Sequence, residues 1–125
     1  MPRKILVVDK EHNITRLVEH ALMRAGYDVI VAYDGREALE KVRSETPDMV
    51  VTEITLPYMD GYALLRELKQ DPNTADIPFF VLSEKATDAD VFRAWQSGVD
   101  CFLKKPFNQI ELIQYVTRVF DQINK

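Results

Sequence analysis

The chain has 125 residues, 46% hydrophobic and 29% charged, a composition typical of a globular domain with a buried core. Its net charge of -4 argues against a nucleic-acid partner, and no apolar run is long enough for a signal peptide or a membrane span. The single cysteine excludes an internal disulfide and suits a reducing cytoplasm. We therefore expect one cytoplasmic domain over residues 1–125, without a nucleic-acid or membrane partner.

Short apolar runs alternate with amphipathic segments along the whole chain. The runs predict buried strands at KILVV (4–8), DVIVAY (28–33), MVVT (49–52), FFVLS (79–83) and CFLK (101–104). Apolar residues at helical spacing follow each run and predict five helices. The predicted helix ends, in chain order, are Gly26 after the first helix, an Asp34–Glu37 capping box, an Asp60 cap, a helix from about Thr87 to Ser97 with Gly98 after it, and an Asn108–Glu111 capping box.

Five strands that are each followed by a helix predict an α/β fold with a single doubly wound, five-stranded parallel sheet. The strands are apolar throughout, as expected for a sheet that is buried on both faces. In such a sheet the functional crevice lies beyond the carboxyl ends of the strands. That rule selects the residues just after each strand: Asp9, Lys10, Tyr33, Asp34, Glu53, Ser83, Glu84 and Lys105. Two carboxylates, a hydroxyl and two ammonium groups among them form the candidate site: Asp9, Glu53, Ser83, Lys10 and Lys105.

Two familiar kinds of site are disfavoured at this edge. The chain has only four glycines and neither a GxxxxGK[ST] nor a GxGxxG motif, so a flavin or nucleotide site on a glycine loop is unsupported. Ser83 lacks the flanking glycines of a hydrolase nucleophile elbow. We therefore expect that the protein is not an enzyme.

Four ordered motifs carry a resemblance over essentially the whole chain: KILVVD, PDMVVTEITLPYMDGYALL, IPFFVLS and GVDCFLKKPF. The chain resembles a response-regulator receiver domain, the CheY-like, flavodoxin-like (βα)5 phosphoacceptor module of two-component signalling. The resemblance implies that an acidic pair after the first strand and an aspartate after the third hold Mg²⁺, and that this aspartate accepts a phosphoryl group from a histidine kinase. It also implies that a hydroxyl and a Lys-Pro pair bind the phosphate, while an aromatic residue on the last strand changes position.

Carried over residue by residue, the resemblance is incomplete. Ser83 matches the hydroxyl and Phe102 the aromatic residue of the switch, while Lys105 precedes Pro106, a candidate cis-proline. Two departures fall in the same pocket. The acceptor position holds Glu53, and the second acid of the pair is Lys10. Asp9 is then the only strong metal ligand left, and the chain resembles a receiver with a degenerate phosphoacceptor pocket.

Both departures oppose phosphorylation. An ammonium group in place of a ligand repels Mg²⁺ by on the order of 4 kcal/mol at ~4 Å, which corresponds to roughly a thousandfold in affinity. The extra methylene of Glu53 pushes its carboxylate into the pocket and disturbs in-line transfer. We therefore expect no Mg²⁺ cofactor and no efficient phosphorylation.

Three interpretations of Glu53 stay open. It could reach Lys10, Lys105 or Ser83 in a permanent ion-pair network, with Lys10 and Glu53 compensating for each other. It could be a relic in a pocket that has no use. It could also imitate an aspartyl phosphate, although imperfectly, because a carboxylate carries about one charge and a phosphoryl group nearly two.

The favoured function is that of a pseudo-receiver, which signals through phosphorylation-independent binding of a protein partner, either a histidine kinase or a downstream effector. The alternative is a functional phosphoacceptor that uses Mg²⁺ and a histidine-kinase phosphodonor. The segment from Thr87 carries more apolar residues than one buried face needs, so either Phe92 or Trp95 is expected to face outward. Together with Lys104 they form the candidate partner face.

Overall fold

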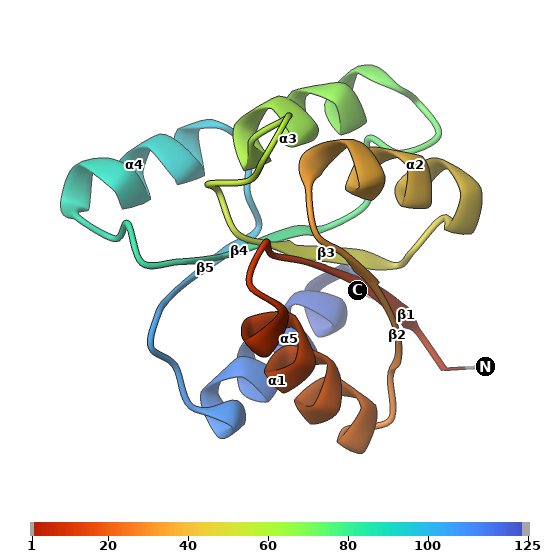
Figure 1. Cartoon of the computed structure of the whole chain (residues 1–125), viewed down its shortest axis with the longest axis vertical. Coiled ribbons are helices and arrows are strands. Elements are labelled where there is room, and N and C mark those ends of the chain that lie inside the picture. The colour runs from red at the N-terminus through yellow and green to blue at the C-terminus, as the bar shows by residue number, and fades with distance from the viewer. Residues whose placement is uncertain (1, 124–125) are drawn as a thin grey trace.

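Figure 1 presents the computed structural model of the chain, which describes residues 2–123. The elements alternate strictly between strands and helices. In chain order they are β1 (Lys4–Val8), α1 (His12–Arg24), β2 (Asp28–Ala32), α2 (Gly35–Glu45), β3 (Met49–Thr52), α3 (Gly61–Gln70), β4 (Phe79–Ser83), α4 (Asp88–Gln96), β5 (Cys101–Lys104) and α5 (Gln109–Ile123).

The five strands form one parallel sheet in the order β2-β1-β3-β4-β5, so the predicted doubly wound fold is confirmed. Helices α1 and α5 cover one face of the sheet, and α2, α3 and α4 cover the other (Figure 1). The strand order reverses direction between β1 and β3, which is the point where such folds open a crevice at the carboxyl edge. None of the helices in residues 2–123 has the length and apolar character that a membrane crossing needs.

Each strand contributes to two separate cores because successive side chains point to opposite faces of the sheet. On β4, for example, Phe80 packs into the core beneath α1 and α5, while Phe79 packs into the core beneath α2, α3 and α4. Both side chains are almost completely buried. The two cores therefore hold the five strand ends rigidly in register at the carboxyl edge.

The predicted end of the second strand and the predicted Asp34–Glu37 capping box are both wrong in part. The strand ends at Ala32, one residue early, because the Tyr33 N–H donates to Glu37 Oε1 at 2.7 Å instead of continuing the ladder. Asp34 does cap α2, accepting from the Glu37 N–H at 2.8 Å. The carboxylate of Glu37 thus bonds one residue upstream of the cap. Asp60 accepts from the Ala63 N–H as expected. Asn108 accepts from the Glu111 N–H, but no return bond from the Asn108 N–H to the Glu111 carboxylate forms in the described chain, so the predicted Asn108–Glu111 capping box is also only half formed.

Helix α4 corrects the expectation that only one of its two aromatic residues faces outward. Phe92 is 63% exposed and Trp95 is 51% exposed. Ala94 is the only buried residue of this nine-residue helix, because its small side chain is the one that faces the sheet. Both aromatic rings therefore lie on the surface.

Cys101 begins β5 and is expected to react slowly in the folded chain. Burial raises the pKa of its thiol to about 11. The reactive thiolate is therefore about a hundredfold scarcer at neutral pH than for a thiol of pKa 9.0. Native alkylation by iodoacetamide should be slow at pH 7 and rise about tenfold per pH unit up to the thiol pKa. Labelling in urea serves as the control, and equal native and unfolded rates would contradict the expectation.

Candidate functional site

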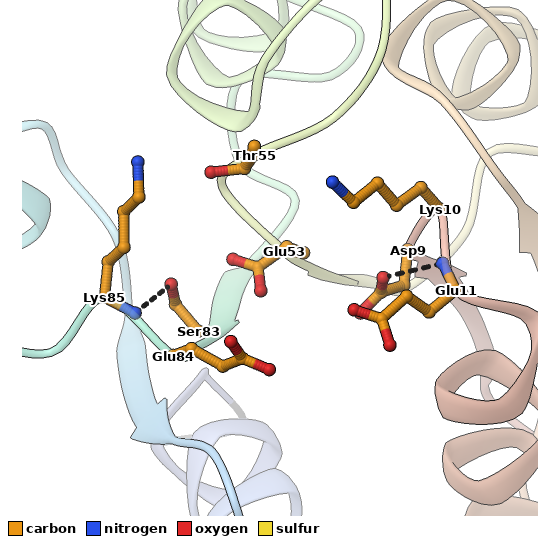
Figure 2. A pocket seen from close by; sticks show the side chains of 8 residues that line it. All are labelled: Asp9, Lys10, Glu11, Glu53, Thr55, Ser83, Glu84 and Lys85. Atoms are coloured by element: carbon orange, nitrogen blue, oxygen red, sulfur yellow. Dashed lines mark hydrogen bonds between the residues drawn. The ribbon is translucent and has the colours of Figure 1, made fainter.

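A pocket of about 190 Å³ opens at the carboxyl edge of the sheet, beyond β1, β3 and β4. Figure 2 shows that its side chains converge from the three loops that follow these strands. The residues that line it are Asp9, Lys10, Glu11, Glu53, Thr55, Ser83, Glu84 and Lys85. Of the eight residues that the strand-end rule selects, five line the pocket: Asp9, Lys10, Glu53, Ser83 and Glu84. Tyr33 and Asp34 do not line it, and Lys105 bonds to Asp9 and Glu53 from the end of β5.

The centre of the site is a buried group of three charges, which we call the Asp9–Lys105–Glu53 triad. The Lys105 ammonium donates to Asp9 Oδ2 at 2.6 Å and to Glu53 Oε1 at 3.0 Å. Asp9 is 3% exposed, Glu53 8% and Lys105 6%. Because all three are buried, each carboxylate depends on the single ammonium between them for its counter-charge.

The second oxygen of each carboxylate also has a donor within the chain. Asp9 Oδ1 accepts from the Glu11 N–H at 3.0 Å (dashed in Figure 2), and Glu53 Oε2 accepts from the Ile54 N–H at 2.7 Å. Both donors are backbone groups of the loops that follow β1 and β3. The network therefore ties two loop starts to the end of β5.

The Lys105 ammonium at the centre of the triad is charged throughout the neutral range. Burial by itself would lower the pKa of Lys105, but hydrogen bonds to Asp9 and Glu53 and their negative charges together raise it above its ordinary value of 10.5. The pKa is thus higher in the folded chain than in the unfolded one. The stability that the raised Lys105 pKa contributes is therefore fully present at neutral pH and is lost as the pH rises from 10.5 through the raised pKa.

Of the three partners considered for Glu53, Lys10 is wrong and Lys105 is confirmed. Glu53 pairs with Lys105 instead. Lys10 is exposed and lies along the rim of the pocket (Figure 2), where it forms no salt bridge with any residue in the range 2–123. The fully buried Ser83 hydroxyl accepts from the Lys85 N–H at 3.1 Å, and no hydrogen bond joins it to Glu53 in the described part of the chain.

The remaining candidate residues lie around this centre. The Lys105–Pro106 peptide bond is cis, the form that the resemblance implies. Phe102 is half-buried and packs against the core beneath α2, α3 and α4. Lys104 is exposed at the end of β5, and together with Phe92 and Trp95 it is available at the surface.

The strand-end rule missed three residues that line the pocket: Glu11, Thr55 and Lys85. Each stands two positions beyond a residue that was selected, namely Asp9, Glu53 or Ser83. An extended chain places every second side chain on the same side. Continuing this alternation past the strand ends would have pointed to these three residues. The missed residues add two charges of opposite sign to the rim.

The donor set does not fit the Mg²⁺ ion that the resemblance implies. Mg²⁺ requires octahedral oxygen ligation, usually built on one or two carboxylates. The buried carboxylates of Asp9 and Glu53 already share one ammonium group, and Lys10 adds a second ammonium that offers no lone pair. Within residues 2–123, no group of three or more His, Cys, Asp or Glu side chains is arranged to hold a metal ion.

The strand order and the position of the pocket are those of the flavodoxin-like α/β fold that CheY has. The sequence profile of the response regulator receiver domain matches residues 5–117. The chain therefore belongs to the family of response regulator receiver domains, the receiving modules of two-component signalling.

Individual relatives agree with this assignment. The chain is 39% identical over 112 residues to the alkaline phosphatase synthesis transcriptional regulatory protein PhoP of Bacillus subtilis, covering 90% of this chain and 46% of that protein. It is 36% identical to the probable transcriptional regulator ycf27 of Porphyridium aerugineum, covering 98% of this chain and 50% of that protein. The chain thus spans about half the length of these curated relatives.

Solved structures give the same result. The chemotaxis response regulator CheY4 of Vibrio cholerae superimposes with a TM-score of 0.89 at 29% identity, covering 95% of this chain and 99% of that one. The signal receiver domain of a histidine kinase from Syntrophus aciditrophicus has a TM-score of 0.89 at 31% identity, covering 98% of this chain and 93% of that one.

Proposed function

We propose that this receiver domain works as a pseudo-receiver: it binds a protein partner without being phosphorylated, uses no Mg²⁺ and catalyses no reaction. The observation that carries the proposal is the Asp9–Lys105–Glu53 triad, in which Lys105 bonds both carboxylates at 2.6 and 3.0 Å. A receiver that is phosphorylated needs a free carboxylate oxygen and a cation to neutralise the transferred group. Here both Glu53 oxygens already accept hydrogen bonds.

The same contacts argue against Glu53 as a built-in imitation of an aspartyl phosphate. An imitation has to engage the hydroxyl that would contact a phosphate, but within residues 2–123 the Glu53 oxygens accept from Lys105 and the Ile54 N–H and form no hydrogen bond with the Ser83 hydroxyl. Through its bond with Lys105, Glu53 links the end of β3 to the end of β5. The domain therefore keeps one arrangement of its pocket and presents a constant surface to its partner.

The partner is a protein, either a histidine kinase or a downstream effector, and the candidate contact face comprises Phe92, Trp95 and Lys104. The two aromatic rings are 63% and 51% exposed on neighbouring turns of α4. Large aromatic side chains of this kind are enriched among residues that dominate binding energies. Their exposure supports a contact role that does not pass through the pocket.

Phosphorylation of the isolated chain tests the proposal. The protein is incubated with acetyl phosphate and Mg²⁺, and its intact mass is followed for the addition of one phosphoryl group. We expect no addition, because Glu53 is held by Lys105 and by the Ile54 N–H. The double variant Lys10→Asp/Glu53→Asp restores both acids and is the matched positive control.

A phosphoryl group on the unmodified chain would contradict the proposal if the Glu53→Gln variant fails to acquire it. That pair of results would identify Glu53 as a working acceptor. It would also favour the alternative function, a Mg²⁺-dependent receiver supplied by a histidine kinase.

A further inference from the structure

We propose that Lys10, added to the Lys105 ammonium that the two buried carboxylates already share, is the charge that excludes divalent cations from the pocket, and that the extra length of Glu53 has no part in this exclusion. The inference deepens the proposed function and rests on it, since it takes the pocket to be a receiver site that no longer binds metal. It differs from the sequence hypothesis, in which the two residues compensate for each other. We assign separate roles to Lys10 and Glu53 because their side chains lie in different parts of the pocket.

The frame of the pocket does not depend on Lys10. Asp9, Glu53 and Ser83 are held by the buried ends of β1, β3 and β4, and their hydrogen bonds involve Lys105 and backbone N–H groups. Lys10 follows β1 as an exposed residue without a salt bridge in the described chain. Its replacement therefore changes the charge of the pocket and leaves the frame in place.

Lys10 nevertheless lies close enough to act on a cation in the pocket. It lines the cavity together with the carboxylates of Asp9, Glu11, Glu53 and Glu84 (Figure 2). In the dielectric of water, one unit charge about 5 Å from a divalent cation changes its binding constant by roughly tenfold. An exposed ammonium group at this rim is therefore sufficient to weaken binding, even where solvent screens it.

Glu53 acts on a different property. Its carboxylate remains an oxygen donor, and its extra length lets Oε1 bond Lys105 while Oε2 bonds the Ile54 N–H. This geometry occupies the acceptor position without adding positive charge. Lys10 therefore accounts for the exclusion of the metal ion, and Glu53 accounts for the loss of the phosphoryl acceptor.

A Mg²⁺ titration followed by amide NMR shifts of Asp9, Glu53 and Ser83 tests this division. For the unmodified chain we expect no saturating shift up to tens of millimolar. Lys10→Met removes one charge and should raise affinity about tenfold, whereas Lys10→Asp changes two charges and should raise it about a hundredfold, into the low millimolar range. Glu53→Asp alone should behave like the unmodified chain.

Lys85→Asp is the matched control, because Lys85 is also an exposed lysine at the rim of the pocket but extends away from Asp9 (Figure 2). It should gain clearly less affinity than Lys10→Asp. An equal gain would show that only net charge matters and would overturn the assignment to Lys10. Saturable Mg²⁺ binding by the unmodified chain, or a gain in Glu53→Asp equal to that in Lys10→Asp, would also overturn it.

The titration contains no phosphodonor, so its outcome is separate from that of the phosphorylation experiment. A chain that binds Mg²⁺ at millimolar concentration but acquires no phosphoryl group would overturn this inference and leave standing the proposal that the domain works without being phosphorylated. A chain that is phosphorylated at Glu53 would overturn the proposed function whatever the titration shows.

Discussion

Replacing Lys105 by Met should lower the free energy of unfolding by about 3–5 kcal/mol, because it leaves two buried carboxylates without their counter-charge. Asp9 and Glu53 are 3% and 8% exposed, so water cannot take over the role of the ammonium. The loss is a large share of the total stability of a domain of this size, which is about 5–15 kcal/mol. Urea denaturation should show it as a lower midpoint at unchanged slope.

The adjacent lysine is the matched control for this variant. Lys104 carries the same charge but is exposed and pairs with no carboxylate in the described chain, so Lys104→Met should change stability by no more than about 0.5 kcal/mol. Adding Glu53→Gln to Lys105→Met should recover part of the loss, since one stranded charge is then removed. A Lys105→Met variant as stable as the unmodified chain would mean that the triad is not a buried ion network.

Replacing Gly35 by Ala should cost about 3 kcal/mol, because the loop between β3 and α3 packs directly against the first residue of α2. A Cβ at position 35 would overlap the carbonyl oxygen of Met59 and lie 2.6 Å from its Cβ. The Gly35 N–H also donates to the Pro57 carbonyl at 3.3 Å. In the alanine variant either the loop or the start of α2 has to move. Because the loop begins at Glu53, a shift of the loop would reach the pocket.

Gly26→Ala is the control for this second variant, since it isolates the backbone cost of losing a glycine. Gly26 has φ of +97°, and no atom lies within 4 Å of the place that an alanine methyl group would take, so its replacement should cost about 1 kcal/mol through strain alone. Amide shifts of Glu53 and Ile54 should change in Gly35→Ala and not in Gly26→Ala. Equal losses of stability in both variants would mean that the loop adjusts freely around position 35.

Most of the fold could be predicted because its signals are local. Four of the five strands have the predicted bounds, and Asp60 caps α3 as expected. The errors at the end of β2 and in the capping box of α2 arose where one side chain could bond to either of two neighbouring N–H groups. Glu37 bonds the N–H of Tyr33 and not that of Asp34, which ends β2 one residue early.

The exposure of both aromatic residues of α4 could not be predicted from the sequence, and the reason is different. Helical periodicity indicates an apolar arc but does not say how closely the helix approaches the sheet. In the folded chain Ala94 alone occupies the contact, so Phe92 and Trp95 both remain outside. The candidate partner face therefore contains two aromatic rings where the sequence predicted one.

By itself, the sequence determined which residues share the site: apolar runs, helix caps and the rule that strand ends meet at one edge place Asp9, Glu53, Ser83 and Lys105 together. Only the tertiary structure decided how these charges pair. Lys105 lies 52 residues beyond Glu53 in the chain, yet its ammonium is 3.0 Å from Oε1, whereas Lys10 points along the exposed rim. Hydrogen bonds within a buried site depend on distances of a few tenths of an ångström, which are set by the packing of β1, β3 and β5 and not by local sequence.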